Sequence, residues 1–206
     1  MGLYERWVLP RLLDYAMRQP PIPKQREKVV PQARGEVLEI GIGSGLNLAY
    51  YDKGKITRLW GVDPSMELRR KAVERAQEAE IEVEFIGLTG ESIPLEDQSV
   101  DTVVTTFTLC TIPDPVSALG EMYRVLRPGG ELLFAEHGRA PDPEVRRLQD
   151  RINPIWKRFA GGCNLNRPID ALVGDAGFDV QSLDKDYLPG PRIATFNYWG
   201  RGVRTT

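Results

Sequence analysis

The chain has 206 residues, of which 41% are hydrophobic and 27% charged, and this suits one soluble domain with a substantial core. Its formal net charge is −2 and its basic residues are spread along the chain, so a small-molecule substrate is favoured over nucleic acid. No apolar run of about eighteen residues predicts a membrane span, and no signal peptide is evident.

The first thirty residues (1–30) predict a helical arm or cap in front of the main domain, which we place at residues 31–206. The arm has two short amphipathic helical pieces, and Pro10 is expected to interrupt the first because proline lacks an N–H and clashes with the preceding turn. Pro20, Pro21 and Pro23 then predict a stiff linker. Peripheral contact of the arm with a membrane and the oligomeric state are left open.

From residue 35 onward, predicted strands alternate with predicted helices. Strands are expected at residues 36–40, 59–62, 81–85, 100–106, 132–135, 178–183 and 193–199. Ser65 and Asp114 are expected to cap two helices, and a proline follows Asp114 at the first helical position. A helix over residues 144–159 is expected to be interrupted at Pro154, and a shorter one covers residues 169–176. This order predicts an α/β fold with a mostly parallel seven-stranded sheet and helices on both faces, whose ligands bind beyond the carboxyl ends of the strands.

The first predicted strand ends in a glycine-rich turn that indicates a nucleotide-like cofactor. Glu39 precedes Gly41, Gly43 and Gly45, and glycines let the backbone approach a ligand closely. The dinucleotide fingerprint would need another glycine where this chain has Leu46. The carboxylate of Glu39 can hold a cationic amino group, and the helix start after the glycines can receive a carboxylate. A tight structural turn is the alternative interpretation.

Asp63 ends the second predicted strand, about twenty residues after the glycine turn, where a carboxylate accepts both hydroxyl protons of a ribose. It would also repel a phosphorylated ribose. The alternative is that Asp63, Pro64 and Ser65 only start a helix. Since the glycine turn carries no basic residue for a phosphate, the combination favours S-adenosylmethionine (SAM).

Further segments resemble the class I SAM-dependent methyltransferase superfamily over about residues 35–135. Residues 88–95 resemble its adenine-binding loop, although Thr89 stands where an Asp is usual, which leaves Gly90 or Glu91 to contact the adenine. Residues 97–101 and 127–130 add to the likeness. The resemblance implies a Rossmann-like fold, SAM as cofactor and S-adenosylhomocysteine as product. The cofactor-binding residues expected are Glu39, Gly41, Ile42, Gly43, Gly45, Asn47, Asp63, Pro64, Ser65, Thr89, Gly90, Glu91, Thr106 and Phe107.

Residues 106–112, 134–138 and 161–167 resemble a narrower branch, the methyltransferase-like thiol S-methyltransferases. This likeness implies methyl transfer to the sulfur of a small thiol. Names in that branch often specify quinones or phospholipids, so a quinone precursor or a phospholipid amine is the alternative acceptor, and a SAM-binding regulator without turnover is an alternative of another class. Residues 105–108 lack the Asn/Asp-Pro-Pro-Tyr sequence of amide and adenine methyltransferases, which argues against a nucleobase.

The single histidine, His137, follows the fifth predicted strand and is a candidate proton acceptor; a structural hydrogen bond is the alternative. Cys110 and Cys163 are expected to be packed, reduced thiols of a cytoplasmic protein, since methyl transfer needs no covalent enzyme intermediate. Arg167 is expected to be structural, and no metal site is predicted. The substrate pocket is expected to include Tyr4, Trp7, Leu109, Cys110, His137, Trp156 and Asn164.

Overall fold

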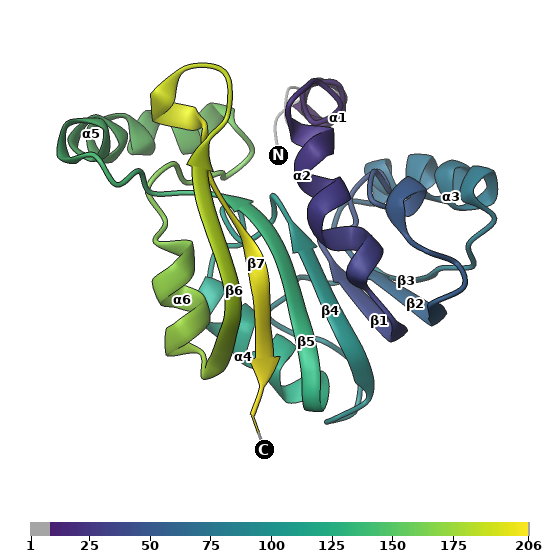
Figure 1. Cartoon of the computed structure of the whole chain (residues 1–206). Helices are drawn as coiled ribbons and strands as arrows, with labels where there is room; N and C mark the ends of the chain where they lie inside the picture. The colour runs from purple at the N-terminus through teal and green to yellow at the C-terminus, as the bar shows by residue number, and fades with distance from the viewer. Residues whose placement is uncertain (1–8, 206) are drawn as a thin grey trace.

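The computed structural model describes residues 9–205, with the side chains described from residue 11, and within this range one seven-stranded sheet runs in the order β3-β2-β1-β4-β5-β7-β6 (Figure 1). Neighbouring strands from β3 to β5 pair in parallel, whereas β7 is antiparallel to both β5 and β6. The expected number of seven strands is confirmed, and the sheet is mixed because β7 reverses direction. Residues 81–83 and 193–195, which the sequence predicts as strand, lie outside the strands, and a 3-10 turn occupies Arg192–Ala194. The strands are β1 (Gly35–Ile40), β2 (Ile56–Val62), β3 (Glu84–Ile86), β4 (Val100–Thr106), β5 (Leu126–His137), β6 (Phe178–Tyr187) and β7 (Phe196–Arg204).

Two of the helices begin at the residues that the sequence indicates. The Asp114 carboxylate accepts hydrogen bonds from the N–H groups of Val116 and Ser117, and Ser65 Oγ accepts one from Leu68 N at 3.4 Å. The helices are α1 (Leu9–Ala16), α2 (Ile22–Val29), α3 (Met66–Ala79), α4 (Pro115–Val125), α5 (Pro143–Phe159) and α6 (Ile169–Asp175), with short 3-10 turns η2 (Val30–Gln32), η3 (Leu48–Tyr50) and η4 (Arg192–Ala194).

The sheet has a hydrophobic core on each face, because alternate residues of its central strands point to opposite sides. On one face, Leu132 and Phe134 of β5 pack with residues of α4 and α6, such as Leu119 and Val173. On the other face, residues of the same strands pack with α2, η3 and α3; they include Leu133, Ala135, Val29, Leu48 and Ala76. Helices therefore cover both faces, as predicted.

Proline positions account for the main errors in the predicted helices. The linker expected at Pro20, Pro21 and Pro23 is wrong in part, because Pro23 lies in the first turn of α2, where its missing N–H removes no helical bond. Pro10 is the second residue of α1, and the stretch before α1 lies outside the described residues. α5 continues through Pro154, because the proline lies on the exposed side of the helix, where the carbonyl left without a partner can face water.

Since α2 contributes Val29 to the core of the sheet, the arm is packed on the domain from at least this helix onward. The boundary at residue 30 stays a prediction. Among the described helices, none combines the length and the apolar character that a membrane span requires.

Candidate active site

The glycine turn after β1, at the carboxyl edge of the sheet, is packed tightly at Gly41 and less tightly at Gly43. Gly41, Gly43 and Gly45 all have positive φ, between +52° and +78°. A Cβ at Gly41 would lie 2.1 Å from Thr108 Oγ1, so close packing excludes any side chain there. At Gly43 the nearest atoms would be 3.8 Å away. The turn therefore packs tightly at Gly41, whereas a Cβ at Gly43 would make only ordinary van der Waals contacts.

Asp63, at the end of β2, holds this turn in place. Its Oδ2 accepts a hydrogen bond from Gly43 N at 2.9 Å, and its Oδ1 accepts one from Ser65 N at 2.8 Å. Pro64 between them is exposed, and burial raises the pKa of Asp63. The carboxylate thus combines the structural role of starting the turn into α3 with a position beside Gly43, where a ribose role stays a prediction.

Glu39 is 1% exposed, and its carboxylate is satisfied within the protein. Asn47 Nδ2 donates to Oε1 at 2.9 Å and Tyr51 OH donates to Oε2 at 2.8 Å. Burial raises the pKa of Glu39 to about 7. Because both of its oxygens accept hydrogen bonds within the protein, the role of Glu39 in this structure is to orient the side chains of Asn47 and Tyr51.

Arg26 of α2 is a site residue that the sequence analysis missed. It is 5% exposed, and its Nη1 lies 2.6 Å from both Asn47 Oδ1 and Thr106 Oγ1. The guanidinium carbon lies 5.4 Å from the centre of the Phe107 ring, and the buried Nε has no hydrogen-bond partner among the described residues. A cleft of about 660 Å³ between α2 and α3 is lined by Arg26, Gly45 and Tyr51, among others. A buried cation therefore faces the network around Glu39.

A second missed residue, Asp14, ties α1 to the glycine turn. Its carboxylate accepts hydrogen bonds from Ser44 Oγ at 2.5 Å, from Lys71 Nζ at 2.9 Å and from Arg75 Nη1 at 3.0 Å. Although burial acts in the opposite direction, the hydrogen bonds of Ser44, Lys71 and Arg75 hold the pKa of Asp14 well below its usual range. No sequence pattern points to this contact, because Ser44, Lys71 and Arg75 are 30 to 61 residues away from Asp14.

The predicted adenine loop lies beside the end of β1. Gly90 is buried, and a Cβ there would lie 2.9 Å from Ile40 Cγ2, so the loop backbone packs directly on the strand. Thr89 is exposed, and Glu91 Oε1 accepts a hydrogen bond from Asp114 N at 3.2 Å. Ile42 packs on Gly61 instead, which indicates a core role for this predicted cofactor residue.

The loop after β4 is held in an uncommon conformation. Phe107 has a φ of +54°, a value that non-glycine residues adopt rarely and mostly where the surroundings impose it. The fully buried carboxylate of Glu136 accepts hydrogen bonds from Thr105 Oγ1 and Thr108 N, both at 3.0 Å, and burial raises its pKa. Arg167 donates to the carbonyl of Leu109, which agrees with its predicted structural role. The loop is therefore fixed by hydrogen bonds to both Glu136 and Arg167.

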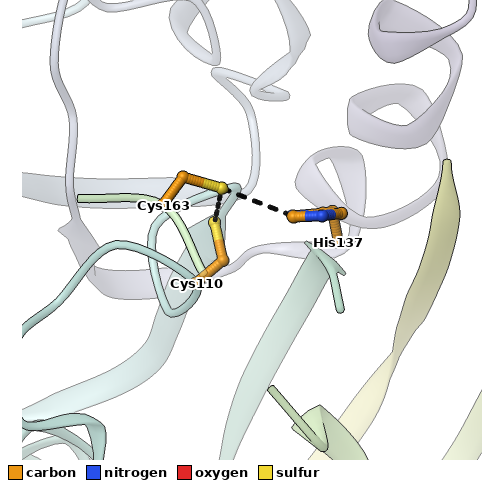
Figure 2. Close-up of side chains that lie close together, drawn as sticks. All are labelled: Cys110, His137 and Cys163. Carbon is orange, nitrogen blue, oxygen red and sulfur yellow. Dashed lines mark hydrogen bonds between the residues drawn. The ribbon is translucent and has the colours of Figure 1, made fainter. Parts of the chain in front are cut away.

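Three residues far apart in the sequence meet beyond β4 and β5 (Figure 2). Cys163 Sγ lies 3.7 Å from Cys110 Sγ and 3.6 Å from His137 Nδ1. Cys110 is 3% and His137 7% exposed, and His137 Nε2 has no hydrogen-bond partner in the described part of the chain. The contact between the two thiols raises the pKa of Cys110 and lowers that of Cys163. His137 does not hydrogen-bond to Glu136, whose acceptors face the loop after β4.

The other predicted pocket residues surround this cluster in part. Leu109 is fully buried, and Asn164 Nδ2 donates to the Cys110 carbonyl at 3.0 Å. Trp156 of α5 lies near Cys163 and is 37% exposed. Tyr4 and Trp7 lie outside the described residues. The structure thus brings Leu109, Cys110, His137, Trp156 and Asn164 to one end of the sheet.

Comparison with known proteins agrees with this geometry. Residues 38–134 match the methyltransferase domain family. The chain is 38% identical over 168 residues to the thiol S-methyltransferase TMT1B of Rattus norvegicus, covering 76% of this chain and 68% of that protein. It is 32% identical over 138 residues to a phosphatidylethanolamine N-methyltransferase of Cereibacter sphaeroides, covering 65% of this chain and 66% of that protein. A solved SAM-dependent methyltransferase of Thermotoga maritima superposes with a TM-score of 0.67 at 22% identity, over 96% of this chain and 98% of that one.

The fold, the glycine turn and these relatives define a SAM-dependent methyltransferase, with SAM as its cofactor. Within this class, the chain belongs to the methyltransferase family that includes the thiol S-methyltransferases TMT1A and TMT1B.

Proposed function

We propose that the chain methylates the sulfur of a small, mostly apolar thiol. The observation that carries the proposal is the 38% identity to a thiol S-methyltransferase over 76% of the chain. The free thiols Cys110 and Cys163 suit a reducing, cytoplasmic setting, which remains part of the proposal.

The residues at the edge of β1 and β2 fit the cofactor. The backbone at Gly43 is packed less tightly than at Gly41, which suits the close approach of a ligand, and Asp63 beside it has oxygen lone pairs left for two ribose hydroxyls. The buried, unpartnered Nε of Arg26 suits the carboxylate of the methionine moiety, with a charge-assisted hydrogen bond. On this assignment Glu39 positions Asn47 next to the amino-acid end of the cofactor.

The acceptor is expected beyond β4 and β5, between Phe107 and the cluster of Cys110, His137 and Cys163. Bound SAM supplies an electrophilic methyl group and leaves as S-adenosylhomocysteine. A thiol has an ordinary pKa of about 8.5, so a useful fraction is ionised near neutrality and needs little general-base help. The buried Nε2 of His137 is the candidate acceptor for the remaining proton. The protein then works chiefly by aligning the two reactants and excluding water.

The experiment is incubation of the purified chain with SAM and a panel of thiols, phenols, quinol precursors and phosphatidylethanolamine vesicles, with the products identified by mass spectrometry. We expect methylated thiols in excess of all other products. Turnover of an amine or a quinol without any methylated thiol would contradict the proposed acceptor. Binding of SAM without any product would favour a regulator.

The phospholipid alternative has one specific observation in its favour, the 32% identity to a phosphatidylethanolamine N-methyltransferase. The exposed apolar side chain of Phe159, at the end of α5, is compatible with either an apolar thiol or a lipid. The vesicles in the panel separate the two, because only the lipid alternative predicts a methylated amine.

A further inference from the structure

We propose that Cys110, His137 and Cys163 form a three-ligand binding site for a soft divalent cation of the zinc type. The two cysteines were expected only to pack, and the sequence predicted no metal. The argument rests on the arrangement of the donor atoms, the loops that fix them and the charge balance of the buried cluster, independently of which acceptor the enzyme methylates.

The donor atoms have the spacing of a tetrahedral site. With zinc–sulfur bonds of about 2.3 Å and zinc–nitrogen bonds of about 2.0–2.1 Å, tetrahedral angles place two sulfurs about 3.8 Å apart and a sulfur and a nitrogen about 3.6 Å apart. The observed separations from Cys163 Sγ are 3.7 Å to Cys110 Sγ and 3.6 Å to His137 Nδ1. All three donor atoms lie within 4.8 Å of one another. Two edges of the triangle therefore already match, and the third needs at most a small rotation of side chains.

In Figure 2 dashed lines join the sulfur of Cys163 to Cys110 and to His137, and the three side chains come from separate parts of the fold. Cys110 lies in the loop after β4, His137 is the last residue of β5 and Cys163 follows α5. Gly161 and Gly162, with φ of +62° and +88°, turn the chain back after α5. This turn returns Cys163 to the edge of the sheet.

The loops that carry the two thiols are fastened to each other. The carbonyl of Cys110 accepts hydrogen bonds from Asn164 N at 2.8 Å and from Asn164 Nδ2 at 3.0 Å. Asn153 Nδ2 of α5 donates to Asn164 Oδ1 at 3.2 Å, and Asn153 Oδ1 accepts a hydrogen bond from Leu165 N at 2.8 Å. A cation would therefore bind donors that are held in place, which lowers the cost of ordering them.

The charge balance also suits a buried divalent cation. Two thiolates and a neutral imidazole around a divalent cation carry no net formal charge, so burial of the occupied site avoids an uncompensated charge. A neutral imidazole that binds the cation through Nδ1 carries its proton on Nε2, so His137 can accept a proton from the thiol only while the cation site is empty. The nearby carboxylate of Glu136 is engaged by Thr105 and Thr108, and Arg167 is directed to a backbone carbonyl. Sulfur and imidazole ligands select zinc-type cations over magnesium or calcium. Three protein ligands leave the fourth tetrahedral position to water or an external ligand.

The test uses the reduced, metal-free full chain, without SAM or acceptor, titrated with Co²⁺ and followed by optical absorption; Zn²⁺ is then added as competitor. We expect about one Co²⁺ per chain, with a thiolate-to-cobalt charge-transfer band that Zn²⁺ abolishes. Cys163→Ser and Cys110→Ser should weaken the band, and each should lower the Zn²⁺ affinity by at least about tenfold. Glu80→Gln, which removes an exposed carboxylate elsewhere on the molecule, is the matched control and should leave binding unchanged.

Circular dichroism and SAM binding verify that each variant folds, and His137→Gln provides a third variant that keeps both thiols. Absence of a charge-transfer band in the wild type would overturn the metal site. So would equal Zn²⁺ affinity of the wild type and the folded variants, because the metal would then bind elsewhere. Neither result bears on the proposed methylation of thiols, which is measured separately with SAM and the acceptor panel.

Discussion

The two halves of the carboxyl edge of the sheet bury different kinds of polar group. Around β1 and β2, Glu39, Asp63 and Arg26 form hydrogen bonds of 2.6–2.9 Å. Beyond β4 and β5, two thiols and an imidazole meet at 3.6–3.7 Å, next to a helix with exposed apolar residues. Fixed charges and short hydrogen bonds suit a cofactor of constant structure, whereas sulfur and apolar groups suit an acceptor held mainly by shape and softness.

The largest effect is expected at Asp63, the proposed partner of the cofactor's ribose. Asp63→Ala should lower SAM affinity about 100-fold, because two charge-assisted hydrogen bonds to the ribose are worth about 1.5 kcal/mol each. Isothermal titration calorimetry measures the change. Glu82→Ala, which removes an exposed carboxylate, is the control. Unchanged affinity in a folded Asp63→Ala variant would refute the ribose role and leave Asp63 as a structural residue of the glycine turn.

A substitution of Asp14 tests whether α1 is held on the glycine turn by charge. Asp14→Asn should destabilise the protein by about 2 to 3 kcal/mol at neutral pH, since it removes the negative charge that pairs with Lys71 and Arg75 and replaces one of the two acceptor oxygens with an NH₂ donor. Because the folded-state pKa of Asp14 is lowered, its contribution is present above the ordinary aspartate pKa and is lost as pH falls through the folded value. The difference in free energy of unfolding between Asp14→Asn and the wild type should therefore become smaller at acid pH.

Thermal unfolding and hydrogen exchange of the α1 amides measure this prediction, with Asp52→Asn as the control because Asp52 forms an exposed ion pair with Lys55. Unchanged exchange in α1 would mean that Asp14 does not hold the arm on the glycine turn.

Glu39 should show the opposite pH dependence, because burial raises its pKa although the hydrogen bonds from Tyr51 and Asn47 and the charge of Arg26 act in the other direction. Its folded-state pKa is raised to about 7, so its stabilising contribution is present below the ordinary glutamate pKa and is lost as pH rises through 7. Between pH 5 and pH 8 the free energy of unfolding of the wild type should fall by about 2 kcal/mol because of Glu39, and this fall should be absent in Glu39→Gln. Chemical unfolding across this range, wild type against variant, measures it; parallel pH profiles of the two proteins would contradict the ionisation of Glu39.

Local signals in the sequence were sufficient for much of the fold and for the glycine turn. Asp114 before a proline and Ser65 after Asp63 each start a helix at the predicted residue, because a helix cap is decided within four residues. The alternation of strands and helices likewise predicted the layers, although not that β7 would reverse, which depends on long-range pairing.

The missed parts of the site depend on contacts between distant segments. Arg26 was missed because Pro23 suggested a linker, and a proline is also compatible with the first turn of a helix. Its partners Asn47 and Thr106 are 21 and 80 residues away along the chain. Cys163 meets Cys110 across 53 residues, so periodicity could not predict the cluster.

The smallest effect is expected at Trp156, beside the proposed acceptor position beyond β4 and β5. Trp156 reaches toward Cys163 from α5, so Trp156→Ala should remove apolar contact with the acceptor and raise its KM about fivefold, equivalent to about 1 kcal/mol, without changing SAM affinity. Ile155→Ala is the matched control, because the adjacent side chain is 65% exposed and lies about 100° further around the helix. Steady-state kinetics with an apolar thiol, beside calorimetry with SAM, separates the two halves. An equal rise in KM from Ile155→Ala would indicate a general apolar surface, and a loss of SAM affinity from Trp156→Ala would show that the halves are not independent.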